Sequence, residues 1–350
     1  MTDIRDCIEK LASSDEADRI YAAEDIGYAN QSAGVLPLLR RLREEPSRAV
    51  KESIFAALLQ IEDDAVIEGA LELLDSDDSF LRNQAVELLQ ALGNKALPYL
   101  GQAFQEGDRD RRKFVIDVIA RLTDPAARDL LALALKDADL NVVITAVESV
   151  GNTRQCQFRE QIESLISPDA QPMVLSACLE ALTHVGDSNS VSAVHSCFGS
   201  IESLPAFLRP SYLKLVGTKG GPQHLAEIAS LAGIQSLDGA VLNAMTSLRN
   251  RYPEISLPSG LAQPLMDMAR RNPGPLAYQA VRLLSGLIDN RDVFEFLAHC
   301  LDHSDKVIRI GAIQAMRQAG GERSEALLSR RLDRETDEEV LQAWGGKNAQ

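Results

Sequence analysis

Two histidines near the C-terminal end are the first candidates for chemistry. The stretch HCLDH places His299 and His303 four residues apart with Cys300 between them, so both imidazoles would face the same way on a helix. That spacing binds a metal ion when further ligands complete the coordination shell. The sequence shows no third or fourth ligand, and the stretch ends an apolar helical segment. We therefore expect an ordinary, partly exposed helix end, with metal binding as the weaker alternative.

Sequence motifs of enzymes are missing throughout the chain. There is no GxxxxGK[ST] phosphate loop, no GxSxG nucleophile elbow and no dinucleotide fingerprint. The stretch GTKGG, at 217–221, is too short and wrongly placed to cradle a phosphate. We therefore expect a protein that is not an enzyme and that carries no cofactor.

Charged side chains recur at one position of segments that are about 31 residues long. Five acidic residues come first along the chain and two basic residues follow. Because solvated helix faces usually mix the two signs, we interpret this row as a partner-binding surface, acidic at one end and basic at the other. The alternative is a plain solvated face, since Glu is common on helix surfaces. The row consists of Glu24, Glu87, Asp117, Glu148, Glu180, Lys214 and Arg282.

The row belongs to a repeat that runs through the chain. The stretch DSDDSFLRNQAVELLQALG, at 75–93, returns as DHSDKVIRIGAIQAMRQAGG at 302–321. We take Arg82 of the first stretch as an anchor and locate the matching position in each repeat. Three and seven residues after each of the first ten anchors the sequence is small or apolar, which places these side chains on one helix face. A second apolar segment precedes each anchor, so a unit is helix, turn, helix. The anchors are Arg19, Lys51, Arg82, Arg112, Val143, Leu175, Arg209, Val241, Ala277, Arg309 and Leu341.

Such units cannot bury their apolar faces alone, and stacking about eleven of them predicts an all-α solenoid, a superhelix. Aspartate often stands four residues before a basic anchor, where it can accept from free N–H groups at a helix start. The arginine can reach an aspartate of its own or a neighbouring repeat. We interpret these pairs as a structural ladder, with direct partner contact as the alternative. The ladder consists of Asp15, Arg19, Asp78, Arg82, Asp108, Arg112, Asp305 and Arg309.

The unit D-x-x-[VL]-R-x-x-A-[VI]-x-x-L resembles the HEAT family, and its length is similar to the short HEAT-like repeats of phycobilin lyases and many bacterial proteins. The resemblance covers essentially the whole chain. It implies a scaffold whose second helices line a concave groove that binds another protein, in bacterial signalling or regulation. No histidine is followed by glutamate, which excludes the di-iron hydroxylases built on such repeats.

The same resemblance leaves a second function open, a phycobilin lyase-like subunit that binds or transfers a bilin chromophore. Such a subunit needs a pocket where polar and aromatic side chains converge on a tetrapyrrole. The aromatic residues of this chain are too dispersed to indicate one. They are Tyr28, Tyr212, Tyr278 and Trp344.

We expect one solenoid over residues 1–350, with regular repeats at 1–166 and 281–350 and an irregular segment at 167–280. In that segment the aspartate position holds other residues, and prolines gather between Pro253 and Pro275. This segment is either a binding site or hinge, or a part of the repeat array where the sequence has drifted without a functional reason. The residues at the aspartate position are Gln171, Pro205, Leu237 and Pro273.

Composition and charge indicate which classes of binding partner are disfavoured. The net charge is −15 and the sequence pI is near 4.9, which opposes binding to nucleic acid or to an anionic membrane surface. The first twenty residues lack the apolar core of a signal peptide, and no stretch is apolar enough to span a membrane. The five scattered cysteines favour a reducing cytoplasm. We therefore expect a cytoplasmic protein whose partner is another protein with a basic or mixed-charge segment.

Overall fold

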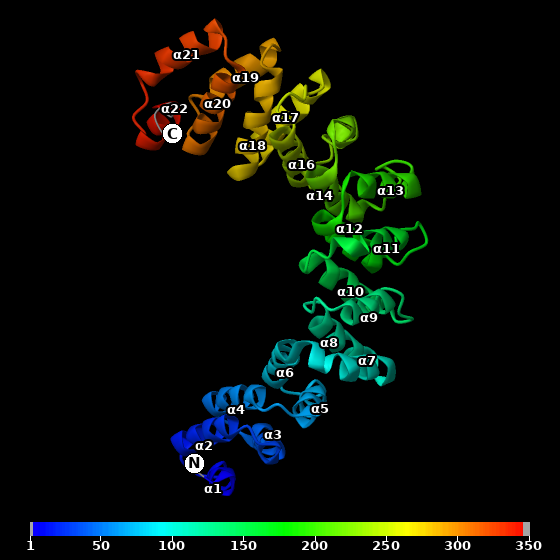
Figure 1. The fold of residues 1–350 in the computed structure, drawn as a ribbon. Coiled ribbons are helices and arrows are strands. Elements are labelled where there is room, and N and C mark those ends of the chain that lie inside the picture. The colour runs from blue at the N-terminus through cyan, green and yellow to red at the C-terminus, as the bar shows by residue number, and fades with distance from the viewer. Residues whose placement is uncertain (1–2, 346–350) are drawn as a thin grey trace. The chain divides into compact units, whose positions relative to one another are not determined.

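The computed structural model describes residues 3–345, and every regular element among them is helical (Figure 1). The chain divides into two compact units, unit 1 at Met1–Ile162 and unit 2 at Glu163–Gln350. Both are stacks of two-helix repeats, which confirms the predicted all-α solenoid. Among these residues no helix is long and apolar enough to cross a membrane.

Unit 1 holds the first helices of the chain. The α-helices are α1 (Ile4–Lys10), α2 (Glu16–Ala29), α3 (Val35–Glu44), α4 (Arg48–Gln60), α5 (Asp64–Leu73), α6 (Ser79–Leu92), α7 (Leu97–Glu106), α8 (Arg109–Ile119), α9 (Pro125–Ala134) and α10 (Leu140–Asn152). Short 3₁₀ segments are η1 (Ser32–Gly34), η2 (Gly93–Ala96) and η3 (Cys156–Phe158), and α11 (Arg159–Ser164) follows.

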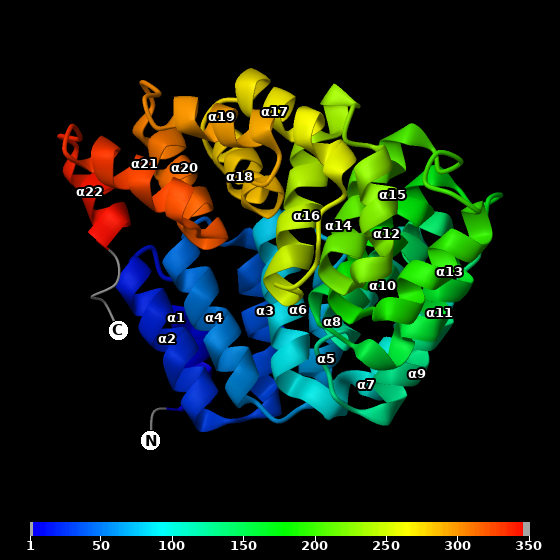
Figure 2. The ribbon, with the colours of Figure 1, turned by 90° about the horizontal axis from the view of Figure 1, so that it is seen from above.

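The helices of unit 1 form two layers. The second helices of the repeats, α2, α4, α6, α8 and α10, contact one another in order, and α3, α5, α7 and α9 form the other layer (Figures 1 and 2). Contact within the layer of second helices is the closer of the two. The predicted anchor face packs between the layers, where Ala22, Ile54 and Ala85 are buried. Burial of these faces against neighbouring repeats stabilises each unit of the stack.

One glycine accounts for the closest approach of two second helices. Gly27 of α2 faces α4, and a Cβ atom at this position would lie 2.8 Å from the Cα atom of Ala57. No real side chain tolerates that distance to a backbone atom, so glycine is required here. Gly27 and Ala57 therefore allow the close spacing of α2 and α4.

Aspartate is the N-cap residue of several second helices, as the sequence predicts. Asp78 accepts from the Phe80 amide at 2.9 Å at the start of α6, and Asp108 accepts from the Arg111 amide at 2.9 Å at the start of α8. These bonds satisfy N–H groups that the helix itself leaves free. Asp15, Asp139 and Asp305 cap α2, α10 and α20 in the same way.

Unit 2 continues the alternation of first and second helices. Its α-helices are α12 (Pro172–Val185), α13 (Ser188–Phe198), α14 (Arg209–Lys219), α15 (Leu225–Ser230), α16 (Asp238–Arg251), α17 (Ala262–Arg271), α18 (Pro275–Leu283), α19 (Arg291–Cys300), α20 (Lys306–Ala319), α21 (Glu322–Leu332) and α22 (Glu338–Gly345). Its 3₁₀ segments are η4 (Ala206–Leu208), η5 (Pro222–His224), η6 (Gln235–Leu237), η7 (Ser259–Leu261) and η8 (Leu284–Leu287).

The irregular segment at 167–280 keeps the two-helix plan but begins its helices differently. Gln171, Leu208 and Leu237 precede α12, α14 and α16 without a side-chain cap. Proline in the first turn replaces the cap in α12, α14 and α18. Proline suits that place because its missing N–H would be unpaired there anyway. The change of pattern is therefore a change of capping chemistry within the same fold.

Candidate functional site

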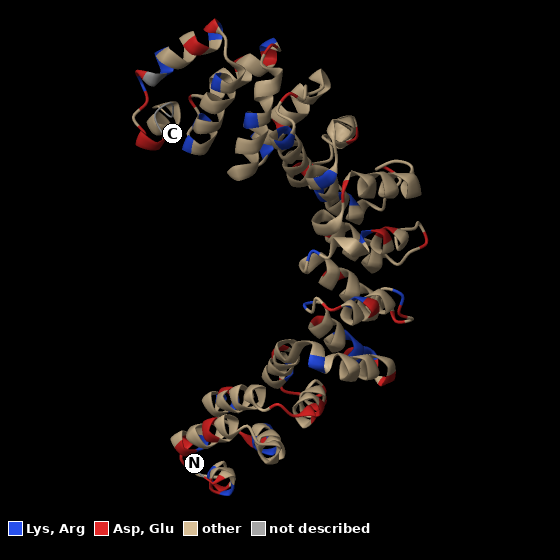
Figure 3. Cartoon of the chain, in the orientation of Figure 1, with Lys and Arg blue, Asp and Glu red and all other residues tan. Residues whose placement is uncertain are grey.

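The acidic residues of the row that lie in unit 1 are Glu24, Glu87, Asp117 and Glu148; we refer to these four as the acidic row. They lie on α2, α6, α8 and α10, which all belong to the layer of second helices, and all four are exposed. Unit 1 also carries most of the negative net charge of the chain (Figure 3). The row therefore lies at the surface of the more acidic unit.

The acidic row has no basic partner of its own. Within the described residues, none of its four carboxylates makes an ion pair, and Glu87 accepts only from the neutral Gln84 side chain, at 2.7 Å. Exposed carboxylates that lack an ion-pair partner can exchange their water contacts for a contact with another molecule. They are free to meet a cation from another molecule.

Asp117 lies in the most crowded surroundings of the row. Desolvation raises the pKa of its carboxyl, and the negative charge of Glu148 raises it further, whereas Lys113 and Arg121 lower it. Asp117 and Glu148 are thus close enough to interact. The spacing predicts that the acidic residues of the row come before the basic ones, but Lys113 and Arg121 lie on either side of Asp117. The charge around the row is therefore more mixed than expected.

A cavity of about 670 Å³ adjoins this part of the row. It lies over α6, α8 and α10, and its lining includes Arg82, Lys113, Phe114, Asp117 and Glu148. Its side chains are of both signs, with one aromatic ring among them. A segment of mixed charge would find complementary groups on several sides.

The ladder arginines bind carboxylates in the next repeat. Arg19 donates from Nε to Glu45 Oε2 at 2.9 Å and from Nη2 to Glu45 Oε1 at 3.0 Å. Its Nη1 donates to the carbonyl oxygens of Ser13 and Ser14, in the turn before its own helix. Such a two-point bond from a guanidinium to a carboxylate is among the stronger hydrogen-bonded pairs. One side chain thus ties its own turn to the following repeat.

The same arrangement recurs along the chain. Arg112 contacts Asp137 at 2.9 Å, and Arg309 contacts Glu335 at 3.1 Å. Lys51 contacts Asp78 at 2.8 Å. Each acceptor carboxylate also accepts the backbone N–H of a residue near its own helix start. The same carboxylate therefore accepts a backbone N–H at a helix start and pairs with a basic side chain of the preceding repeat.

Arg82 departs from this arrangement. It donates to the Ser76 carbonyl at 2.5 Å and lies 5.9 Å from the centre of the Phe114 ring, but it makes no ion pair with a described residue. The pair Asp78/Arg82 is accordingly split, since Asp78 binds Lys51 of the preceding repeat. Arg82 contributes positive charge to the cavity instead.

The carboxylates that receive the ladder arginines do not stand at the aspartate position from which the ladder was predicted. Glu45, Asp137 and Glu335 each stand six residues before an anchor, whereas the aspartates that were singled out stand four before it. The recurrence of acids at that second position is the signal that could have identified them. Arg271 occupies this same position before the anchor Ala277, and it binds Asp238 of the preceding helix at 2.6 Å. At this junction the acid lies on the earlier helix and the base lies later in the chain, which is the reverse of the other junctions.

The remaining row residues lie in unit 2. Glu180 of α12 forms an ion pair with Lys214 of α14. Arg282 of α18 bonds to neutral groups, the hydroxyl of Tyr278 at 3.2 Å and the side-chain amides of Gln314 and Gln318. The row in unit 2 is therefore partly neutralised by its own neighbours, in contrast to the acidic row.

The candidate metal ligands make separate backbone contacts. His299 Nδ1 lies 2.7 Å from the Glu295 carbonyl oxygen, and His303 Nδ1 accepts from the Asp305 amide at 3.0 Å. Cys300 is buried, and burial raises the pKa of its thiol to about 11. His299 and His303 thus each have a local structural contact, and Cys300 belongs to the core.

The aromatic residues considered for a bilin belong to different repeats. Tyr28 is exposed on α2, and within unit 2 Tyr212 is buried in α14 while Tyr278 belongs to α18. Trp344 lies in α22 beside the guanidinium of Arg317. They do not form one aromatic site within unit 2.

Comparison with protein families identifies HEAT repeats in two stretches, residues 4–90 and 262–344. The chain is similar in structure to importin beta, with 12% sequence identity and a TM-score of 0.57 over 98% of this chain. It spans 59% of the length of that importin beta chain. Kap121p bound to Nup53p matches with 12% identity and a TM-score of 0.51, over 97% of this chain and 44% of Kap121p. A search of curated protein sequences gave no match. At this identity the likeness shows the fold.

Proposed function

We propose that this solenoid of HEAT repeats is a non-enzymatic scaffold that binds another protein along the groove of its second helices. The partner segment is basic or of mixed charge, and its lysines and arginines pair with Glu24, Glu87, Asp117 and Glu148. One observation carries the proposal. Four exposed carboxylates of one layer have no ion-pair partner in unit 1, although the carboxylates at its repeat junctions are bound to arginine or lysine.

Electrostatics gives this surface a kinetic role. Carboxylates of like sign along one layer attract a cationic segment from a distance and orient it, which raises the association rate more than the final affinity. Lys113 and Arg121 add sites for acidic residues of the partner. Nucleic acid is disfavoured because the same field repels phosphate.

The fold is suited to this role. Structures of Kap121p, whose architecture is similar, contain bound Ste12p or Nup53p, which supports a protein-binding role for this solenoid. From the resemblance to bacterial HEAT-like proteins we also propose a role in signalling or regulation. The five free cysteines, of which Cys156 is exposed, suit a reducing cytoplasm. No feature of residues 3–345 favours a bilin-binding lyase.

The test is capture of partners on the immobilised full chain. Two variants carry the same change of charge. The first reverses the acidic row to lysine, and the second reverses Glu9, Glu44, Glu68 and Asp129 on the first helices α1, α3, α5 and α9, which are exposed and make no ion pair among the described residues. We expect capture from a lysate of the native organism, identified by mass spectrometry, to be lost in the first variant and kept in the second.

The two variants separate a specific surface from net charge. If both lose capture equally, attraction depends on total charge and the groove has no special role. If neither loses it, the partner binds elsewhere and the proposed surface is wrong. Circular dichroism of both variants checks that the helices remain intact.

A further inference from the structure

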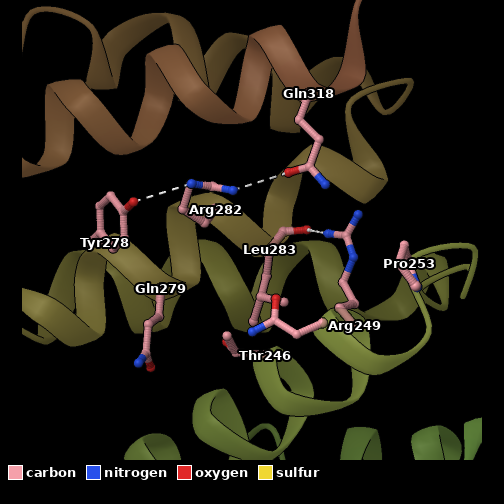
Figure 4. A pocket seen from close by; sticks show the side chains of 9 residues that line it. Thr246, Arg249, Pro253, Tyr278, Gln279, Arg282, Leu283 and Gln318 are labelled. Atoms are coloured by element: carbon pink, nitrogen blue, oxygen red, sulfur yellow. Dashed lines mark hydrogen bonds between the residues drawn. The ribbon is translucent and has the colours of Figure 1, made fainter. Parts of the chain in front are cut away.

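Unit 2 contains a polar cavity between α16 and α18 that the acidic row does not involve. Its volume is about 430 Å³ (Figure 4). Arg249 and Thr246 come from α16, Gln279 and Arg282 come from α18, and Gln318 comes from the end of α20. The part of the chain that the structure describes contributes no carboxylate to the lining. The cavity is therefore positively charged inside an acidic protein.

Both arginines bond only to neutral groups. Arg249 Nη1 donates to the Leu283 carbonyl and to Ser285 Oγ, both at 3.1 Å. The most distant contact of Arg282 is from Nη2 to Gln318 Oε1, at 3.4 Å. Within the described residues neither guanidinium has an ion pair, in contrast to Arg271 on α17. Two positive charges thus face one cavity without a counterion.

Among residues 3–345, three buried polar atoms at the cavity lack a hydrogen-bond partner. They are Thr246 Oγ1, Gln279 Oε1 and Arg282 Nε. Leaving a buried donor or acceptor unpaired is costly, so a group that satisfies all three would be held firmly. Arg282 Nε and Nη2 form one edge of the guanidinium, and this edge carries only the long bond to Gln318. Such an edge presents two parallel N–H groups, the arrangement that binds the two oxygens of a carboxylate.

The surroundings of Arg249 disfavour its positive charge. Burial lowers the pKa of Arg249, and the like charge of Arg282 lowers it further. Gly286 leaves the room for Arg249, because a Cβ atom there would lie 3.2 Å from its Nη1. An anion between the two guanidinium groups would relieve their repulsion.

We propose that this cavity binds a carboxylate that has a hydrogen-bond donor beside it, as an aspartate or glutamate residue in a peptide has. The carboxylate pairs with the edge of Arg282 that Nε and Nη2 form, next to Arg249. The peptide N–H pairs with Gln279 Oε1 or Thr246 Oγ1. In Figure 4, Gln279 and Thr246 lie below Arg282, whereas Gln318 lies above it. This assignment rests on the proposed function, because the carboxylate would belong to an acidic residue of the protein partner.

A carboxylate fits better than a phosphate for two reasons. Arg249 lies in the last turn of α16 and Arg282 in the last turn of α18, and helix C-terminal ends carry negative partial charge. That field disfavours a dianion more than a monoanion. Phosphate sites also tend to use backbone N–H groups at helix N-terminal ends, whereas Arg249 and Arg282 come from the last turns of their helices.

The test measures binding of a small probe to the full chain by ligand-observed NMR. The probe is N-acetyl-glutamate N-methylamide, which carries a carboxylate and two peptide N–H groups. Glutarate supplies carboxylates without the N–H groups, the glutamine analogue supplies the N–H groups without the carboxylate, and inorganic phosphate supplies another oxyanion. We expect the glutamate probe to bind most tightly, with a loss of about tenfold or more for the glutamine analogue.

Three variants locate the site. Arg282→Met removes the charge and the edge, and Arg282→Lys keeps the charge but removes the edge. Arg291→Met is the matched control, because Arg291 is exposed on α19 and pairs with Glu295 of its own helix. We expect both changes at Arg282 to weaken probe binding about tenfold or more and the control to leave it unchanged.

Several results would overturn the proposal. These are absence of saturable probe binding, tighter binding of phosphate, glutarate equal to the probe, or Arg282→Lys with unchanged affinity. Because the probe is small and the variants lie in unit 2, a negative result here leaves capture through the acidic row unaffected. The failure of either proposal can therefore be told from that of the other.

Discussion

At the scale of single residues, a buried carboxylate at a repeat junction contributes more to stability than an exposed one. Glu45 is 3% exposed and accepts from Arg19, from Arg41 and from the Ser47 amide. Removing it leaves those donors unpaired inside the junction. The exposed pair between Arg48 and Glu52 has no such constraint.

We predict that Glu45→Ala lowers the free energy of unfolding by about 2 kcal/mol, because hydrogen bonds to a charged group are lost and Arg19 keeps its charge without a partner. Urea denaturation followed by circular dichroism measures this change. Glu52→Ala is the control and should cost less than about 1 kcal/mol, as exposed pairs do. Equal effects of the two substitutions would show that the junction contact is no stronger than a surface pair.

Arg82 is predicted to be a minor stabiliser. Its substitution by alanine removes the bond to the Ser76 carbonyl, so we expect a loss of about 1 kcal/mol in the free energy of unfolding and retained partner capture. Thermal denaturation and the capture assay measure the two quantities. Unchanged stability together with lost capture would assign Arg82 to partner contact.

The junction carboxylates also give the stability a pH dependence. Burial raises the pKa of Glu45, but the hydrogen bonds from Arg19, the Ser47 amide and Arg41 outweigh it, and the net pKa is lowered. The pKa of Glu335 is lowered in the same way, although burial opposes the bonds from Asp337, Thr336 and Arg309. A lowered carboxyl pKa stabilises the fold above the pKa of the unfolded chain, and this contribution is lost as the pH falls.

We therefore predict that stability declines as the pH falls below about 4.3, the ordinary pKa of glutamate, towards the lower values of the folded state. The Glu45→Gln variant cannot titrate at this position. Its stability should accordingly change less over the same interval, as measured by urea denaturation at a series of pH values. Parallel pH curves for the variant and the wild type would contradict the assignment.

At the scale of the helices, close packing outweighs helix propensity. Gly27→Ala would improve the propensity of α2 by up to about 1 kcal/mol, yet its Cβ atom would meet the α4 backbone at 2.8 Å. We predict a net destabilisation of about 1–3 kcal/mol from the displacement of the two helices. Gly101→Ala in α7 is the control, because its nearest neighbour would be 3.9 Å away, and it should stabilise slightly. Urea denaturation of both variants decides between the two effects.

At the scale of the whole molecule, the acidic row should control how fast a partner arrives. Reversal of Glu24, Glu87, Asp117 and Glu148 to lysine should slow association sharply at low salt and much less at high salt, since screening removes long-range attraction. Stopped-flow association with a captured partner at several salt concentrations measures this. An association rate that depends on salt equally in variant and wild type would place the contact elsewhere.

The fold could be predicted because periodicity is read within one helix. Ala22, Ile54 and Ala85 follow their anchors at a fixed offset, and the structure buries all three. Contacts between repeats were harder to predict, because they depend on which side chains of two turns meet. Glu45 lay outside the aligned aspartate position, and nothing in the spacing alone indicates that Arg82 lacks a carboxylate partner. The crowding at Asp117 likewise depends on helices that are distant in sequence.

The reversed junction of Asp238 and Arg271 has a consequence for the order of the repeats. At the usual junction a base on the earlier helix meets an acid in the later turn, as with Arg309 and Glu335, whereas here the acid comes first. Shuffling or deleting repeats would therefore bring carboxylate against carboxylate, or guanidinium against guanidinium, wherever the two kinds were joined. Repeats with the same fold are thus not interchangeable, because the order of acid and base at a paired junction limits which repeat can adjoin it.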